Sequence, residues 1–271
     1  MKALHFLCST FALALIYPVA ACAQEANSTI LAANNAIGFA ASDMLMNYQE
    51  HITPGPSDTE SGWMPGFDIQ LDNMNNAFVP NLYWAIHYQY ASGNIHYLGS
   101  YMDGTPATGL DAATTNRVLA KFGIGIPWQS SVVVTPYLAG GYQDWQRNLL
   151  GTGGYDETYS AGLVGAGLLL QIAPTPRWVL GLDTELLAVV DGENTSTGLM
   201  PYPVPIAFGT SGEEKIGLQA NYHLRGPWHF FAGTAFTHFN YTGGTNPSAG
   251  IEEPSSSTNQ FATDVGVAYQ Y

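Results

Sequence analysis

The charged side chains of this sequence stand in pairs and at alternating positions that can support acid–base chemistry. Arg147 and Glu157 flank a glycine-rich segment, and Asp183 and Glu185 stand two residues apart. Two carboxylates on one face of a strand can divide the roles of general acid and general base. The same carboxylates beside arginine or lysine can instead form buried ion pairs or line a ligand site. The elements that carry these charges decide between the two uses.

Apolar and polar residues alternate along the chain in stretches that predict half-buried β-strands. The ten predicted strands cover residues 37–50, 62–73, 80–92, 114–126, 132–147, 156–171, 177–191, 213–224, 228–241 and 259–271. Short turns join them in alternation with longer segments rich in Gly, Pro, Ser, Thr and Asn, at residues 51–61, 93–113, 148–155, 192–212 and 242–258. The first stretch also fits a helix, which leaves an eight-stranded arrangement as the alternative.

The alternation places nearly every charge of five strands on one face. Arg117 and Lys121, for example, alternate with Val118 and Phe122. A charge that faces lipid costs about 2–4 kcal/mol at the membrane midplane, so the charged face must point into a lumen. We expect Arg147 to lie there among Glu157, Asp183 and Glu185. The predicted lumen-facing polar network consists of Asp68, Asp72, His87, Arg117, Lys121, Arg147, Glu157, Asp183, Glu185, Lys215, His223 and Asp264.

The N-terminus has the pattern of a secretory signal peptide over residues 1–23. Lys2 precedes an apolar stretch too short for a retained membrane helix, and Ala21-Cys22-Ala23 fits an A-x-A cleavage site. Cleavage there makes Gln24 the first mature residue and removes both cysteines, which excludes disulfides and thiol catalysis. The alternative is a lipoprotein box at residues 19–22, which leaves a lipidated Cys22.

Composition favours a closed β structure. After the leader, no segment approaches the roughly 18–20 consecutive apolar residues of a spanning helix, so a membrane protein here must be a closed β-barrel. Aromatic residues make up 13% of the chain and charged residues 10%, which suits a barrel with aromatic girdles. We therefore predict an all-β, closed, antiparallel transmembrane β-barrel over residues 36–271, preceded by an N-terminal segment at 24–35. Seven basic residues against 21 acidic ones argue against a nucleic-acid partner.

One hairpin carries a family resemblance. Residues 137–147 (YLAGGYQDWQR) and 153–159 (GGYDETY) form a Gly-Tyr-x-x-Trp-x-Arg strand followed by a Tyr-x-Glu strand. The pair resembles a hairpin of uncharacterised outer-membrane β-barrel proteins of Gram-negative bacteria. That resemblance implies a ten-stranded barrel in the outer membrane, with residues 24–35 in the periplasm, and it brings no catalytic residue.

The last strand supports the same resemblance. Residues 261–271 alternate strictly between the two faces and include the outward aromatics Tyr269 and Tyr271. This pattern resembles the closing strand of outer-membrane barrels, which the barrel-assembly machinery recognises. The alternative is an amphipathic edge strand of a secreted sandwich.

Catalytic patterns known from barrel enzymes are incomplete in this sequence. Proteases of the omptin type use paired Asp with an Asp–His couple, yet no Asp-x-His stands at the top of a predicted strand. Lipid A deacylases use His and Ser two residues apart, whereas Asn240 follows His238 at that spacing. No HExxH, Walker or nucleophile-elbow pattern occurs, and no His cluster has metal-ligand spacing. We therefore expect no enzyme activity, no cofactor and no metal.

Three functions remain open from the sequence. The favoured one is a narrow or gated channel, or a structural barrel, with a charged lumen that side chains largely fill. The second is a surface adhesion or interaction protein that acts through its loops, with the apolar segment 199–208 (LMPYPVPIAF) as a contact surface or a plug. The third is a barrel enzyme. The expected partners are outer-membrane lipid, lipopolysaccharide and the assembly machinery, besides an unidentified solute or surface ligand.

Overall fold

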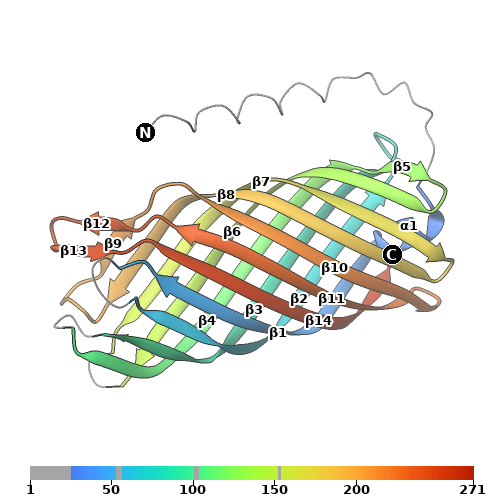
Figure 1. Cartoon of the computed structure of the whole chain (residues 1–271). Helices are drawn as coiled ribbons and strands as arrows, with labels where there is room; N and C mark the ends of the chain where they lie inside the picture. The colour runs from blue at the N-terminus through green and yellow to red at the C-terminus, as the bar shows by residue number, and fades with distance from the viewer. Residues whose placement is uncertain (1–25, 53–56, 101–103, 152–153) are drawn as a thin grey trace, which may run out of the picture.

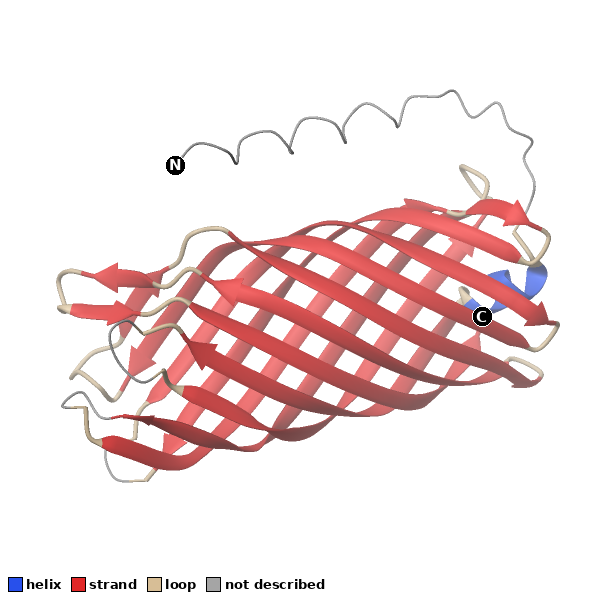
Figure 2. Ribbon diagram, viewed as in Figure 1, coloured by secondary structure: helices blue, strands red, loops and turns tan. Residues whose placement is uncertain are grey.

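The computed structural model describes residues 26–52, 57–100, 104–151 and 154–271, so the predicted leader at 1–23 lies outside the described residues. Within them, one short helix, α1 (Ser28–Ala33), precedes a β-barrel (Figures 1 and 2). The barrel strands are β1 (Ala36–Glu50), β2 (Thr59–Asn75), β3 (Leu82–Ser100), β4 (Pro106–Ile124), β6 (Val132–Leu150), β7 (Asp156–Thr175), β8 (Trp178–Thr197), β10 (Ser211–Arg225), β11 (Trp228–Tyr241) and β14 (Ser256–Gln270).

The ten long strands found in the described residues close into one antiparallel barrel. Closure comes from β1 and β14, which pair from Ala36↔Gln270 to Glu50↔Ser256. The short strands β5 (Ile126–Gln129) and β9 (Val204–Ala207) extend the sheet at β6 and β8. The predicted fold class and strand number are thus confirmed. The helical alternative for the first stretch and the eight-stranded alternative are wrong.

The two faces of the wall differ as the alternation predicts. Leu186, Phe122 and Leu218 point outward and are 72%, 58% and 57% exposed, whereas Glu185 and Lys121 point inward and are 1% and 4% exposed. Such outward residues form an apolar belt around the barrel, as a lipid-facing wall requires. Figure 1 shows α1 and the C-terminus at one end, here called the turn end. The opposite end carries β9, β12 (Gly244–Asn246) and β13 (Ile251–Glu253) and is here called the loop end.

Several strands continue past the apolar belt toward the loop end. On β3 the inward residues Ile95 and Tyr97 are buried, while the outward Asn94 and His96 are exposed. The polarity of the two faces is therefore reversed relative to the belt. This reversal explains why the prediction of a long loop at 93–113 was wrong: an outward polar face in water lacks the apolar signal by which a membrane strand is recognised. The connection between β3 and β4 covers only residues 101–105.

A chain of outward side chains marks the edge of the belt. Tyr88 Oη donates to Asn116 Oδ1 at 2.7 Å, and Asn116 Nδ2 donates to Asp144 Oδ1 at 3.0 Å. Asp43 departs from the pattern, since it faces outward between Pro65 and Thr263 at belt level. The contacts of the described residues give no physical account of that carboxylate.

Helix α1 closes the turn end of the lumen. Asn27 caps it by accepting from the Thr29 backbone N–H at 2.9 Å, and Ile30 is fully buried against Met74, Tyr83 and neighbouring residues. The sequence predicted only an N-terminal segment at 24–35, because six helical residues are too few to produce a periodic pattern. None of the helices within the described residues is both long and apolar enough to span a bilayer.

The C-terminal aromatics hold the closing seam. Tyr269 packs edge-on against Trp228 with ring centroids 5.2 Å apart. Tyr271 donates its backbone N–H to the Asn35 carbonyl at 3.1 Å and its hydroxyl to the Asp72 carbonyl at 2.8 Å. These bonds connect β14 to the chain on the far side of the seam. Recognition of Tyr269 and Tyr271 by an assembly machinery stays a prediction.

Candidate functional site in the barrel lumen

The lumen is built in layers between its two ends. From the turn end to the loop end these are the α1 floor, a polar layer with a cavity, an apolar layer, and a buried cluster of charges. Each layer consists of the inward side chains at one level of the strands. The predicted network residues, except His223, are divided between the polar layer and the buried cluster.

The first ion cluster of the polar layer centres on Lys121. Its ammonium contacts Asp183 and lies 2.6 Å from Glu185 Oε1 and 3.3 Å from the Tyr137 hydroxyl. Tyr137 in turn donates to Asp183. Three acceptors therefore surround Lys121, and its charge is compensated.

Arg117 forms the second ion cluster, toward the loop end. Its guanidinium donates to both oxygens of Glu213, with Nη1–Oε2 at 2.9 Å, and to Gln143 Oε1 at 3.1 Å. Glu213 was absent from the predicted network. It stands two residues before the inward Lys215 on the same strand, so the alternation also places it in the lumen. Lys215 lies 3.6 Å from Glu185 Oε1, beyond hydrogen-bond distance.

The opposite wall of the polar layer carries carboxylates. Asp72 accepts from the Tyr83 hydroxyl at 2.9 Å and lies 3.1 Å from His87 Nε2. Asp68 and Asp264 stand on either side of β1. All of these except Tyr83 were predicted, and they border, together with Lys121 and Lys215, a cavity of about 180 Å³.

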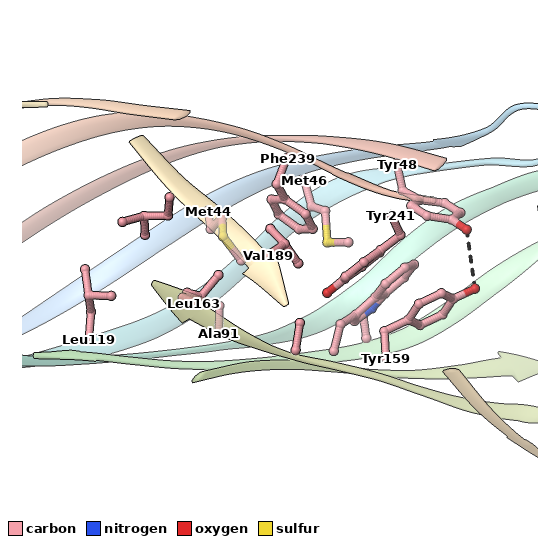
Figure 3. Close-up of a cluster of buried hydrophobic side chains, with 14 of the residues drawn as sticks. Met44, Met46, Tyr48, Ala91, Leu119, Tyr159, Leu163, Val189, Phe239 and Tyr241 are labelled. Atoms are coloured by element: carbon pink, nitrogen blue, oxygen red, sulfur yellow. Dashed lines mark hydrogen bonds between the residues drawn. The ribbon is translucent and has the colours of Figure 1, made fainter. Parts of the chain in front are cut away.

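An apolar layer follows toward the loop end, and Figure 3 shows part of it. Trp145 stacks on Tyr159 with centroids 5.0 Å apart, and Tyr159 stacks on Tyr241 at 5.8 Å. The Tyr48 and Tyr159 hydroxyls are 3.3 Å apart. Because its members come from strands around the barrel, the layer obstructs the lumen; they include Met44, Met46, Tyr48, Met64, Ile95, Trp145, Tyr159, Val189, Phe239 and Tyr241.

Arg147 occupies the buried cluster beyond the apolar layer and is 2% exposed. Its guanidinium contacts the carboxylates of Glu60 and Glu157, and Glu50 Oε1 lies at 4.0 Å. Glu157 also accepts from Asn194 Nδ2 at 2.9 Å. The pairing of Arg147 with Glu157 is as the sequence predicted. Glu50 and Glu60 were missed, and Glu60 lay in a segment taken for a loop.

The predicted association of Arg147 with Asp183 and Glu185 is wrong. Strand β7 lies between the strands that carry these residues. Arg147 on β6 pairs with Glu157 of β7, whereas Asp183 on β8 pairs with Leu169 of β7, which is twelve residues farther along that strand. At about 3.3 Å per residue this offset is roughly 40 Å. Asp183 and Glu185 therefore lie with Lys121 in the polar layer, because they stand near the turn-end start of β8 whereas Arg147 stands near the loop end of β6.

Glu253 closes the buried cluster from the β12–β13 hairpin. It accepts from the Tyr159 hydroxyl at 2.7 Å. Burial, together with the nearby Glu157 and Glu50 carboxylates, raises the pKa of Glu253 to about 8 from an ordinary value of 4.5. Because the folded chain holds this proton more tightly than the unfolded chain, the stabilisation is complete below pH ~4.5 and is lost as the pH rises through about 8.

We expect the β12–β13 hairpin to lose hydrogen-exchange protection between pH 6 and pH 9, after correction for intrinsic exchange rates. The substitution Glu253→Gln should reduce this pH dependence, because the amide keeps the acceptor and cannot ionise. Part of it should remain, because burial raises the pKa of the nearby Glu50 to about 7. Glu252→Gln changes the exposed neighbour and is the matched control. Equal pH dependence in wild type and Glu253→Gln would contradict the assignment.

The remaining candidates lie outside both charged layers. His223 is at the turn end, with Nε2 2.7 Å from the Gly226 carbonyl oxygen, and it does not border the cavity. In the segment 199–208, Val204 and Ile206 are 1% exposed and Phe208 packs on Tyr241 with centroids 5.3 Å apart. Across the described ranges, no group of His, Cys, Asp and Glu has the proximity to hold a metal ion.

The comparisons with known proteins bear on the fold alone. No protein-family model matches the chain, and no curated protein matches its sequence. The outer membrane protease OmpT from Escherichia coli is similar in structure, with a TM-score of 0.58 and 10% identity over 88% of this chain and 97% of that chain. The translocator domain of the autotransporter NalP from Neisseria meningitidis gives 0.39 and 11% over 88% and 89%.

A deltaS2S3 mutant of the TodX monoaromatic hydrocarbon channel gives a TM-score of 0.39 and 10% identity over 90% of this chain and 93% of that chain. NalP and TodX are too distant in geometry to support an argument about this chain. The likeness to OmpT extends over nearly the whole of both chains and supports the barrel fold. This chain therefore has the fold of the outer-membrane β-barrel proteins.

Proposed function

We propose that the protein is a non-enzymatic barrel of the bacterial outer membrane whose lumen is closed to free diffusion. In this orientation the apolar belt spans the bilayer, the turn end faces the periplasm and the loop end faces outward. The observation that supports closure is the pair of obstructions, α1 at the turn end and the apolar layer toward the loop end. A lumen of ten strands is narrow enough for side chains to block, whereas open pores have about 16 or more strands.

The arrangement of histidines favours a non-catalytic barrel. In the described part of the chain, the one histidine in an ion pair with a carboxylate is His87, which contacts Asp72 in the lumen. His238 has amide partners instead, with Nδ1 2.9 Å from Asn259 Oδ1 and Nε2 3.4 Å from Asn240 Nδ2. A catalytic acid–base couple at the loop end would need an exposed histidine beside a carboxylate. His87 lies in the lumen and His238 contacts amides, so neither fits this role.

The adhesion alternative receives less support from its main sequence feature. The segment 199–208 was expected to act as a contact surface or as a plug. Val204 and Ile206 are buried and Phe208 joins the aromatic stack, so much of the apolar surface of this segment is used in packing. This arrangement favours a cap on the lumen.

We expect the refolded protein to show no steady open conductance in planar lipid bilayers. A variant that lacks residues 26–35 and carries Met64→Ala and Tyr241→Ala should conduct, because both obstructions are then removed or thinned. Phe236→Ala, on the outward face of β11, is the control that keeps the lumen unchanged. Folding of each variant is verified by its heat-dependent shift on a gel. A stable open step in the wild-type protein would refute closure.

A further inference from the structure

We propose that the cavity in the polar layer binds a small zwitterion, whose amine faces Asp68 and Asp264 and whose carboxylate faces Lys215. The inference goes beyond the proposed closed barrel, since a closed lumen needs no ligand. Three features of the cavity carry it: its size, the acidic wall, and a lysine that retains free donors.

The cavity has the volume of a small solute. It measures about 180 Å³, and an apolar cavity of about 150 Å³ suffices for benzene. The space therefore suits a molecule of about six to nine heavy atoms. Glycines maintain it: a Cβ at Gly217 or Gly181 would find its nearest neighbouring atom 3.6 Å or 3.8 Å away, so neither position is filled by packing.

Two carboxylates that form no ion pair with any described residue, Asp68 and Asp264, form one wall of the cavity. The small residues Ala40 and Ser42 separate Asp68 from Asp264, and a Cβ at Gly233 would lie 2.5 Å from Asp264 Oδ1, so glycine makes room for that carboxylate. Asp68 Oδ2 is buried and accepts no hydrogen bond from any described residue. A buried carboxylate oxygen without a donor is costly, and a ligand ammonium would supply the donor.

Lys215 also borders the cavity and supplies a positive charge. Its one ion pair within the described ranges is the 3.6 Å contact with Glu185, so its ammonium donors remain available to a ligand carboxylate. The other two cations of this layer are already occupied: Lys121 contacts two carboxylates, and Arg117 donates to both oxygens of Glu213. A lysine without a close ion pair, in the same cavity as two carboxylates without ion pairs, fits an amino acid better than a simple anion.

The end of α1 forms the floor of the cavity at the turn end. Ala33 and Asn34, at the end of α1, border it. Asn34 and Gln171 exchange two side-chain hydrogen bonds, of 2.7 Å and 2.8 Å, across the lumen. Separation of this amide pair would admit a small polar solute from the turn end.

The test is isothermal titration calorimetry of the refolded chain in detergent with ω-amino acids of about three to six carbons, which have six to nine heavy atoms. We expect at least one to bind, and to bind at least tenfold more tightly than the amine or the carboxylic acid of the same length. Absence of binding across the series would overturn the proposal. Equal binding of the single-charge analogues would overturn it as well.

Substitutions at the cavity test whether the ligand binds there. Gly217→Leu should weaken binding of the best ω-amino acid at least tenfold by filling the cavity, whereas Gly212→Leu, on the outward face of the same strand, should not. Lys215→Met should weaken the amino acid at least tenfold and leave the matching amine unaffected, and Asp264→Asn should weaken both. Each variant must keep the wild-type heat shift. Unchanged affinity in folded Gly217→Leu would show that the ligand binds elsewhere and would refute the site.

Discussion

Replacement of Arg147 by alanine is expected to lower the free energy of unfolding by about 3–5 kcal/mol, the range for removal of one partner from a buried ion pair. Arg147 is 2% exposed and contacts Glu60 and Glu157. Without the guanidinium, these carboxylates and the nearby Glu50 would face one another at low dielectric with no cation among their described contacts. Protonation of the carboxylates offsets part of the loss, so the effect should decrease at acidic pH.

The measurement is urea unfolding of the refolded protein in detergent or vesicles, followed by the heat-dependent shift on a gel. Arg177→Ala is the matched control, because Arg177 lies exposed in a turn at the opposite end and should change stability by less than about 0.5 kcal/mol. A neutral result for Arg147→Ala would mean that this side chain is solvated and that the packing of the loop end differs from the structure.

A double-mutant cycle identifies the coupled partner. Arg147→Ala combined with Glu157→Gln should cost less than the two single changes added together, because the shared interaction is lost only once. The coupling of residues in direct contact is about 0.5–3 kcal/mol. The pair Arg147→Ala and Asp183→Asn should instead be additive, since these residues belong to different layers. Coupling in the second pair would restore the association that the sequence favoured.

Leu218→Arg should have the second-largest effect, a loss of about 2–4 kcal/mol from a charge on the lipid face near the bilayer midplane. Leu218 is 57% exposed and pairs with Leu182 and Thr234 in the middle of the belt. The measurement is the folded fraction after insertion into vesicles, over a urea series.

Gln219→Arg is the control for this substitution, because it adds the same charge to the next residue, which faces the lumen. It should insert normally. Equal damage from both substitutions would mean that the effect comes from the added charge itself and not from the face on which it stands. Equal tolerance would argue that the belt does not contact lipid.

The wall of the barrel was largely predictable from sequence, because alternate residues of a membrane strand face lipid and the lumen and must therefore differ in polarity. Phe122 and Lys121, adjacent in sequence, separate to 58% and 4% exposure for that reason. The same rule placed Asp68, Arg117 and Asp183 in the lumen. The rule does not apply beyond the belt, because there the outer face of a strand meets water and no longer needs to be apolar. The prediction therefore missed Glu60 and much of β3.

The partners of the inward charges were not predictable from spacing. Alternation gives the face on which a residue stands, but its position along the strand and the register between strands give its level in the lumen. Arg147 and Glu185 share the inward face and lie in different layers for this reason. Glu253 was missed because it lies on a hairpin outside the barrel, where no alternation marks the side chain that turns inward.

The continuation of paired strands past the belt has a consequence for recognition by other molecules. From Asn94 to Ser100 the backbone of β3 is held in register by β4 and lacks a free edge on that side. A linear peptide copied from this region presents a flexible backbone and side chains from both faces, whereas the folded protein displays one face of a rigid sheet. A binding surface on this face of the folded protein therefore combines residues from neighbouring strands, and a linear peptide would reproduce it poorly.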